Sequence, residues 1–126
     1  MITLTNMHEH TAQEVFDVCA LHLLTQNKRS GDTHGTGNCM YRNPFGLKCA
    51  IGILIPDELY HASMEGNGIN TLAAEYGITD HVDILRDLQS LHDIECDVSQ
   101  WKKRLTRMAR SYSLSDKLVV NFKQVK

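Results

Sequence analysis

The side chains best suited to chemistry are the thiol and imidazole groups found between residues 34 and 61. Thiolate and imidazole are ligands that zinc prefers, and His34, Cys39, Cys49 and His61 could supply a tetrahedral set. Nine residues separate the two cysteines, whereas paired cysteines of structural zinc sites are typically about two to four residues apart. A zinc site is therefore kept only as an alternative, and we expect no cofactor.

Cys49 is also a candidate nucleophile, because it stands where a short strand is expected to pass into a helix. Backbone N–H groups and the helix dipole stabilise a thiolate at such a position. His34, His61 or His92 would have to act as the base. The neighbours of Cys49 are mostly apolar, however, and burial makes a thiol inert. We therefore assign no catalytic residue and do not expect an enzyme, with a cysteine-dependent enzyme as the alternative.

Charge is divided unevenly along the chain. The last 28 residues contain eight basic residues and one acidic residue, whereas the others contain five basic and fourteen acidic residues. Lys103, Arg104, Arg107 and Arg110 would form the basic side of a helix and could contact phosphates. The pI of about 6.4 and the aromatic content of 6% argue against a nucleic-acid-binding module, which stays an alternative. Two solvated faces, or a contact between neighbouring helices, explain the charges more simply.

The segment from Asn38 to Gly52 combines turn residues with two cysteines. Its central Asn-Pro-Phe-Gly sequence, residues 43–46, is typical of a tight turn. Proline fixes the backbone at the second position, and glycine accepts the left-handed conformation at the fourth. We therefore predict a small β-hairpin whose arms contain Cys39 and Cys49.

The loop and hairpin, residues 32–46, form the surface that we expect to bind a protein partner. Tyr41, Arg42, Asn43 and Phe45 are its candidate contact residues. We expect Tyr41, Arg42 and Phe45 to be its exposed main contacts, because aromatic and arginine side chains dominate the energetics of protein interfaces. The alternative for the aromatic ring at the tip is that it folds back over the segment that follows the hairpin.

Helical patterns dominate elsewhere. Thr11-Ala-Gln-Glu is a capping box, in which Thr and Glu satisfy backbone N–H groups, and it predicts a helix to about Gln26. Apolar periodicity and end signals predict further helices at about 71–76, 80–92 and 100–112. Residues 118–122 could form a strand or a helix.

These elements predict one domain over the whole chain, with frayed ends at residues 1–10 and 123–126. With 126 residues, of which 42% are hydrophobic, the chain can bury about two-thirds of its unfolded surface. We expect an α+β fold, mainly helical, with one small β-hairpin. The N-terminus lacks a signal peptide pattern, and no apolar run is long enough to span a membrane, which predicts a cytoplasmic protein with free thiols and no membrane partner.

The central part of the chain contains a series of short motifs: Cys39-Met-Tyr-Arg42, Gly46-Leu-Lys-Cys-Ala-Ile-Gly52, Ile55-Pro-Asp57, Tyr60 and Met64-Glu-Gly66. Together they resemble a family of small uncharacterised proteins of phages and bacteria. The resemblance spans residues 11–112, and the family has no established activity. It implies an accessory protein that binds and modulates a host protein, in the cytoplasm of the host cell if a phage encodes it.

Overall fold

The computed structural model describes residues 2–28, 30, 40–94 and 98–123, and in these residues the fold is helical. The helices are α1 (Ala12–Gln26), α2 (Ile69–Tyr76), α3 (Val82–Ile94), α4 (Trp101–Ser111) and α5 (Lys117–Asn121). Four 3-10 helices join them: η1 (Met7–Glu9), η2 (Gly52–Leu54), η3 (Ala62–Met64) and η4 (Val98–Gln100). No strand is present in the described ranges, so the prediction of an α+β fold is wrong.

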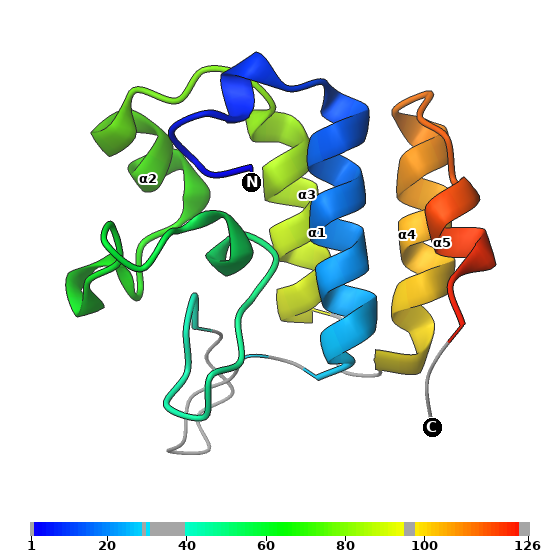
Figure 1. Cartoon of the computed structure of the whole chain (residues 1–126), viewed down its shortest axis with the longest axis horizontal. Helices are drawn as coiled ribbons and strands as arrows, with labels where there is room; N and C mark the ends of the chain where they lie inside the picture. The colour runs from blue at the N-terminus through cyan, green and yellow to red at the C-terminus, as the bar shows by residue number, and fades with distance from the viewer. Residues whose placement is uncertain (1, 29, 31–39, 95–97, 124–126) are drawn as a thin grey trace.

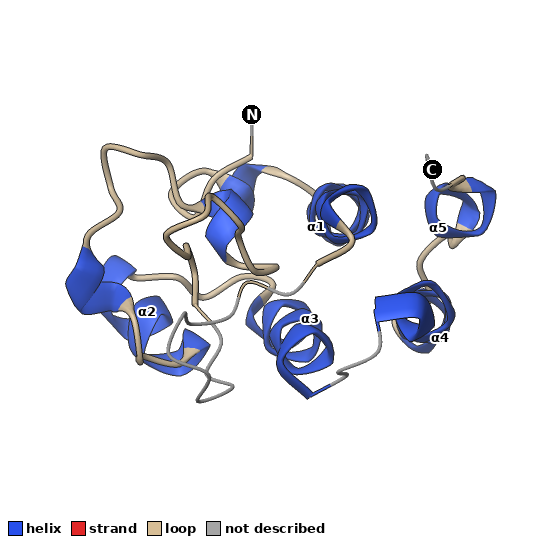
Figure 2. Cartoon of the chain, turned by 90° about the horizontal axis from the view of Figure 1, so that it is seen from below, coloured by secondary structure: helices blue, strands red, loops and turns tan. Residues whose placement is uncertain are grey.

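Helices α1, α3 and α4 pack against one another, and α3 and α4 run in opposite directions (Figure 1). The short α5 covers α4 and α1, while α2 packs on α3 at the other end of the molecule (Figure 2). The largest buried side chains of this core include Phe16 on α1, Leu85 on α3 and Trp101 on α4. Ile51 and Leu54, from the segment around η2, are buried as well. This segment, which lies outside the long helices, therefore completes the core.

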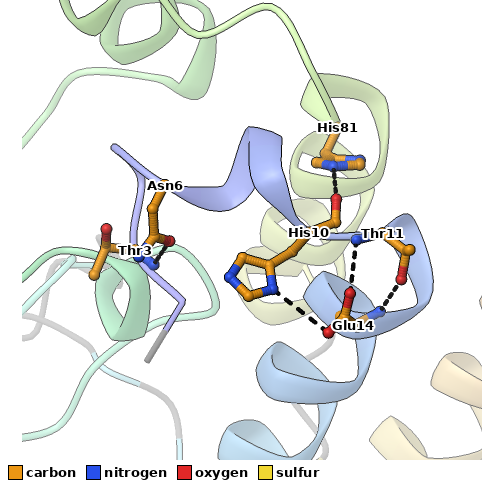
Figure 3. A network of polar contacts seen from close by, with 6 residues as sticks. All are labelled: Thr3, Asn6, His10, Thr11, Glu14 and His81. Atoms are coloured by element: carbon orange, nitrogen blue, oxygen red, sulfur yellow. Dashed lines mark hydrogen bonds and ion pairs between the residues drawn. The ribbon is translucent and has the colours of Figure 1, made fainter.

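The start of α1 confirms the predicted capping box. The Thr11 hydroxyl accepts the Glu14 N–H at 3.1 Å, and the Glu14 carboxylate accepts the Thr11 N–H at 3.0 Å (Figure 3). The bond from the Thr11 backbone, together with His10, holds the pKa of Glu14 below its usual value. The imidazole of His81 reaches the same corner and donates to the carbonyl of His10 at 2.9 Å. The end of α1 lies at Gln26, where the sequence predicted it.

The other helices follow the sequence with small differences. Gly77 ends α2 in the left-handed conformation, with φ of 66°, as its position after the helix predicts. The helix predicted at about 100–112 is α4, and η4 leads directly into it. The ambiguous segment at 118–122 is helical and belongs to α5. None of the helices in the described ranges is both long and apolar enough to cross a bilayer.

The predicted β-hairpin is wrong, although the chain does reverse direction at residues 43–46. Only Arg42 and Lys48 form an antiparallel bridge, and no strand extends from it in the described part of the chain. The two arms share two backbone bonds, from the Asn43 N–H to the Leu47 carbonyl at 2.9 Å and from the Cys49 N–H to the Tyr41 carbonyl at 3.4 Å. The Tyr41 N–H, which would continue the ladder, donates to the Glu65 carboxylate instead. Beyond Cys49 the chain enters the turn that leads to η2, which ends the pairing. The other predicted arm contains Cys39, which lies outside the described residues.

Candidate functional site

The turn at residues 43–46 projects from the molecule and has a fixed backbone. The Asn43 side-chain oxygen accepts the N–H groups of Phe45 at 3.0 Å and of Leu47 at 2.9 Å. Backbone bonds from Gly46 to Asn43 and from Asn43 to Leu47 close the turn. Gly46 has φ of 83°, a conformation that other residues rarely adopt. Phe45 stands at the tip and is 79% exposed, which confirms its predicted exposure, while its role as a contact residue stays a prediction.

Helix α1 holds one arm of the turn through Gln26 and His22. The Gln26 amide accepts the Lys48 N–H at 2.9 Å and donates to the Lys48 carbonyl at 2.8 Å. Nε2 of His22 lies 2.9 Å from the same carbonyl, and it must donate because a carbonyl oxygen only accepts. Burial lowers the pKa of His22, so its imidazole is neutral at neutral pH. These contacts take the place of a neighbouring strand.

Glu65 holds the opposite arm with a single carboxylate. Its two oxygens accept the backbone N–H groups of Tyr41 at 2.8 Å and of Arg42 at 3.1 Å. The Tyr60 hydroxyl donates to the same carboxylate at 2.6 Å. Desolvation and this hydrogen bond raise the pKa of Tyr60 to about 12. The carboxylate therefore has three donors, and the arm is fixed to the chain that follows η3.

The Arg42 side chain is largely covered by its neighbours, so the prediction that it is exposed is wrong. Its side chain is only 18% exposed, and its guanidinium lies 4.7 Å from the centre of the Tyr60 ring. It donates to the Ile55 carbonyl at 2.6 Å and pairs with Asp57 at 2.8 Å. The buried Nε of Arg42 has no hydrogen-bond partner among the described residues.

Tyr41 is also buried, with 6% of its surface exposed, so it is not the exposed contact residue that was predicted. Its hydroxyl donates to the carbonyl of Asn67. The backbone of Tyr41 also passes very close to Gly52. A Cβ atom at Gly52 would lie 2.0 Å from the Tyr41 carbonyl oxygen, closer than real Cβ atoms come. Only glycine fits at this crossing.

A buried contact joins the turn to α3 through Ser30. The Ser30 N–H donates to Nε2 of His92 at 3.0 Å, and the Ser30 hydroxyl donates to the Leu47 carbonyl at 3.0 Å. The ring of His92 lies 5.7 Å from the indole of Trp101, centre to centre. Nε2 of His92 therefore helps to hold Ser30, whose hydroxyl in turn holds the turn. Sequence reasoning did not find Gln26, Glu65 or Ser30, because no local pattern marks a side chain that binds backbone far along the chain.

The described residues of the other predicted sites do not form a metal or catalytic cluster. Cys49 is fully buried, and its sulfur accepts the Gly52 N–H at 3.3 Å, whereas His61 is exposed and contacts Ser63. Burial, reinforced by nearby Cys49, raises the pKa of Cys19 to about 12. His34 and Cys39 lie outside the described residues, and within those residues no three potential ligands gather around a metal position.

No family model, curated protein or solved structure matches this chain.

The basic residues predicted on the last long helix are all exposed on α4: Lys103, Arg104, Arg107 and Arg110. Arg110 pairs with Asp116 at 3.1 Å. Since α4 contacts α3, α1 and α5 through its other faces, these four residues line the outer side of the bundle.

Proposed function

We propose that this chain is a binding protein that recognises a host protein through the turn at residues 43–46, with Phe45 as its main contact. The observation that carries the proposal is the 79% exposure of Phe45 on a backbone fixed by hydrogen bonds. In the described part of the chain, Leu21 and Val120 are the other large apolar side chains that are exposed, at 45% and 48%. Aromatic residues are enriched among interface positions whose truncation costs most binding energy.

The rigidity of the turn supports this proposal. A contact residue that is already held in one conformation loses less conformational entropy on binding. Glu65, Gln26 and Asn43 together bind backbone groups on both sides of Phe45. Tyr41 and Arg42 act in this proposal as supports of the turn, not as contacts of the partner.

The sequence motifs are the basis for the kind of partner that we propose. Their resemblance to small proteins of phages and bacteria favours an accessory protein that acts in the cytoplasm and modulates a bacterial host protein. The proposal includes no catalytic step, because the buried thiol of Cys49 is a poor nucleophile.

The test compares Phe45→Ala with two matched variants, Leu21→Ala and Val120→Ala, each of which removes an exposed apolar side chain elsewhere. The immobilised chain is incubated with a bacterial host extract, and the retained proteins are identified. We expect a host protein that binds the original chain and both control variants but not Phe45→Ala. With that protein purified, Phe45→Ala should raise Kd about tenfold or more.

The melting temperature separates loss of contact from loss of fold. Phe45→Ala should leave it unchanged within about 2 °C, since the ring is mostly in water. If Phe45→Ala retains the same host proteins as the original chain, or if the two controls lose them equally, the turn is not the recognition surface.

A further inference from the structure

A cleft between the N-terminal segment and the end of α2 lies away from the turn. The chain that leads from α2 to α3 passes beside η1 at the upper edge of Figure 1, and a cavity of about 350 Å³ opens there. Thr5 and His8 line one side of the cleft, and Tyr76, Ile78 and Asp80 line the other. The volume is within the range of small-molecule sites, which are typically about 300–1,000 Å³.

Contacts outside the cleft hold its two sides in place. The Leu4 N–H donates to the Leu54 carbonyl at 2.8 Å, which fixes the N-terminal segment to the chain around η2. The Ile78 N–H donates at 2.8 Å to a carbonyl in the last turn of α2. His81 then joins the two sides, because its imidazole donates to the His10 carbonyl at 2.9 Å (Figure 3). The cleft is therefore formed before any ligand binds.

The apolar surface of the cleft comes from Tyr76 and Ile78. Both side chains are half-buried and pack against the core, so each also keeps exposed surface. Leu4 and Met7 line the cleft as well, but they are almost fully buried and add little exposed surface. An aromatic ring such as that of Tyr76 attracts cations to its face as well as apolar groups.

The polar groups of the cleft favour a positive charge. The Asp80 carboxylate is exposed and makes no hydrogen bond or ion pair with another residue that the structure describes. No lysine or arginine is among the lining residues. Gly77, at the C-terminal end of α2, lines the cleft too, and the carbonyl end of a helix has a partial negative charge. The hydroxyl of Thr79 is a further acceptor at this edge.

A metal ion does not fit these groups. Asp80 is the only carboxylate among the lining residues, whereas hard cations need several oxygen ligands. In the described part of the chain, no three potential metal ligands lie close enough together to share an ion. The cation that suits the cleft is therefore an organic one.

We propose that this cleft binds a small primary amine, with an ammonium group on a compact apolar body. The ammonium pairs with the Asp80 carboxylate and donates to the Thr79 hydroxyl, and the apolar body lies against Tyr76 and Ile78. An ammonium has three N–H donors and no acceptor, which matches a site built from acceptors. The site is independent of the turn at residues 43–46, because no residue of the turn lines the cleft.

The probes are benzylamine and butylamine, with benzyl alcohol as the neutral analogue and benzoate as the anionic one. Each is titrated into the full chain at about pH 8, where a free imidazole is neutral and an alkyl ammonium is charged, while backbone amide shifts are followed by NMR. We expect saturable shifts at the amides of residues 5–8 and 76–80 with at least one amine. Saturation by benzylamine alone identifies an aromatic body, and saturation by butylamine alone identifies an aliphatic body such as that of a lysine side chain.

Two charge variants supply the matched comparison. Asp80→Asn keeps the size of the side chain but removes its charge, and should weaken amine binding roughly fivefold, as expected for one ion pair at an open site. Glu75→Gln removes the same charge from the exposed face of α2 without touching the lining of the cleft, and should change the affinity less than twofold. Because both residues are exposed, neither variant is expected to unfold the chain.

Four results would overturn the proposal: no saturable shift with either amine, equal binding of benzyl alcohol, equal binding of benzoate, or equal loss of amine binding in the two variants. Equal loss would show that the amines respond to the general negative charge of this region and not to Asp80. None of these results affects the test of Phe45, since that test uses a different partner and different variants.

Discussion

The start of α1 and the turn at residues 43–46 are both held by side chains that bind backbone groups, but over very different distances in sequence. At α1, Thr11 and Glu14 bind each other's backbone N–H groups across three residues. At the turn, Gln26 and Glu65 reach backbone groups 22 to 24 residues away. The helix end can therefore form by itself, whereas the arms of the turn depend on the packed fold. An exposed tip on such a base stays rigid only while the fold is intact.

The largest expected effect follows from adding one methyl group at Gly52. A Cβ there would meet the carbonyl oxygen of Tyr41 at 2.0 Å, so Gly52→Ala must separate the Tyr41 backbone from the start of η2. We expect a loss of about 3 kcal/mol or more in the free energy of unfolding, measured with urea. Gly68→Ala is the matched control, because a Cβ at Gly68 meets nothing within 4 Å and its φ of −79° suits any residue. It should change stability by less than about 1 kcal/mol.

Equal stability of the two glycine variants would show that the Tyr41 carbonyl can move away without cost. The crossing would then not hold the turn against the core, and the comparison with α1 would lose its basis.

Removal of the carboxylate of Glu65 should have the next largest effect. Glu65→Ala leaves the N–H groups of Tyr41 and Arg42 and the Tyr60 hydroxyl without their acceptor. Because these donors are partly buried, we expect a loss of about 2–3 kcal/mol in the free energy of unfolding. Amide hydrogen exchange at Tyr41 and Arg42 should also become faster. Glu75→Ala, which removes an exposed carboxylate from α2, serves as the control and should leave both measurements nearly unchanged.

If amide exchange at Tyr41 and Arg42 stays slow in Glu65→Ala, the arm is held by its own bridge to Lys48. In that case the turn would resemble an ordinary hairpin more closely than its hydrogen bonds indicate.

The sequence predicts the local features of this fold well. The capping box, the helix stop at Gly77 and the turn conformation at Gly46 each depend on residues within a few positions of one another. The prediction of two hairpin strands was wrong because the mostly apolar run from Leu47 to Ile55 has no periodicity that distinguishes a strand from a buried turn. Such a run shows that the segment is buried and leaves its backbone geometry open.

The candidate site was predictable only at its tip. Phe45 is exposed as expected because its position depends on the turn alone. Tyr41 is buried and Arg42 is largely covered because Asn67, Tyr60 and Ile55, more than a dozen residues away, cover or bind them. The exposure of the basic side of α4 followed from helical periodicity.

Thr11→Ala should have the smallest of these effects and should act on α1 alone. It removes the hydroxyl that accepts the Glu14 N–H, and loss of such a cap costs about 1 kcal/mol. We expect that decrease in urea unfolding, with faster amide exchange at Glu14 and unchanged amide shifts for Phe45 and Leu47. The variant Thr11→Ser keeps the hydroxyl and should restore stability. A changed amide shift at Phe45 in Thr11→Ala would instead show that the start of α1 is coupled to the turn. Local capping at α1 and long-range support of the turn would then not be independent.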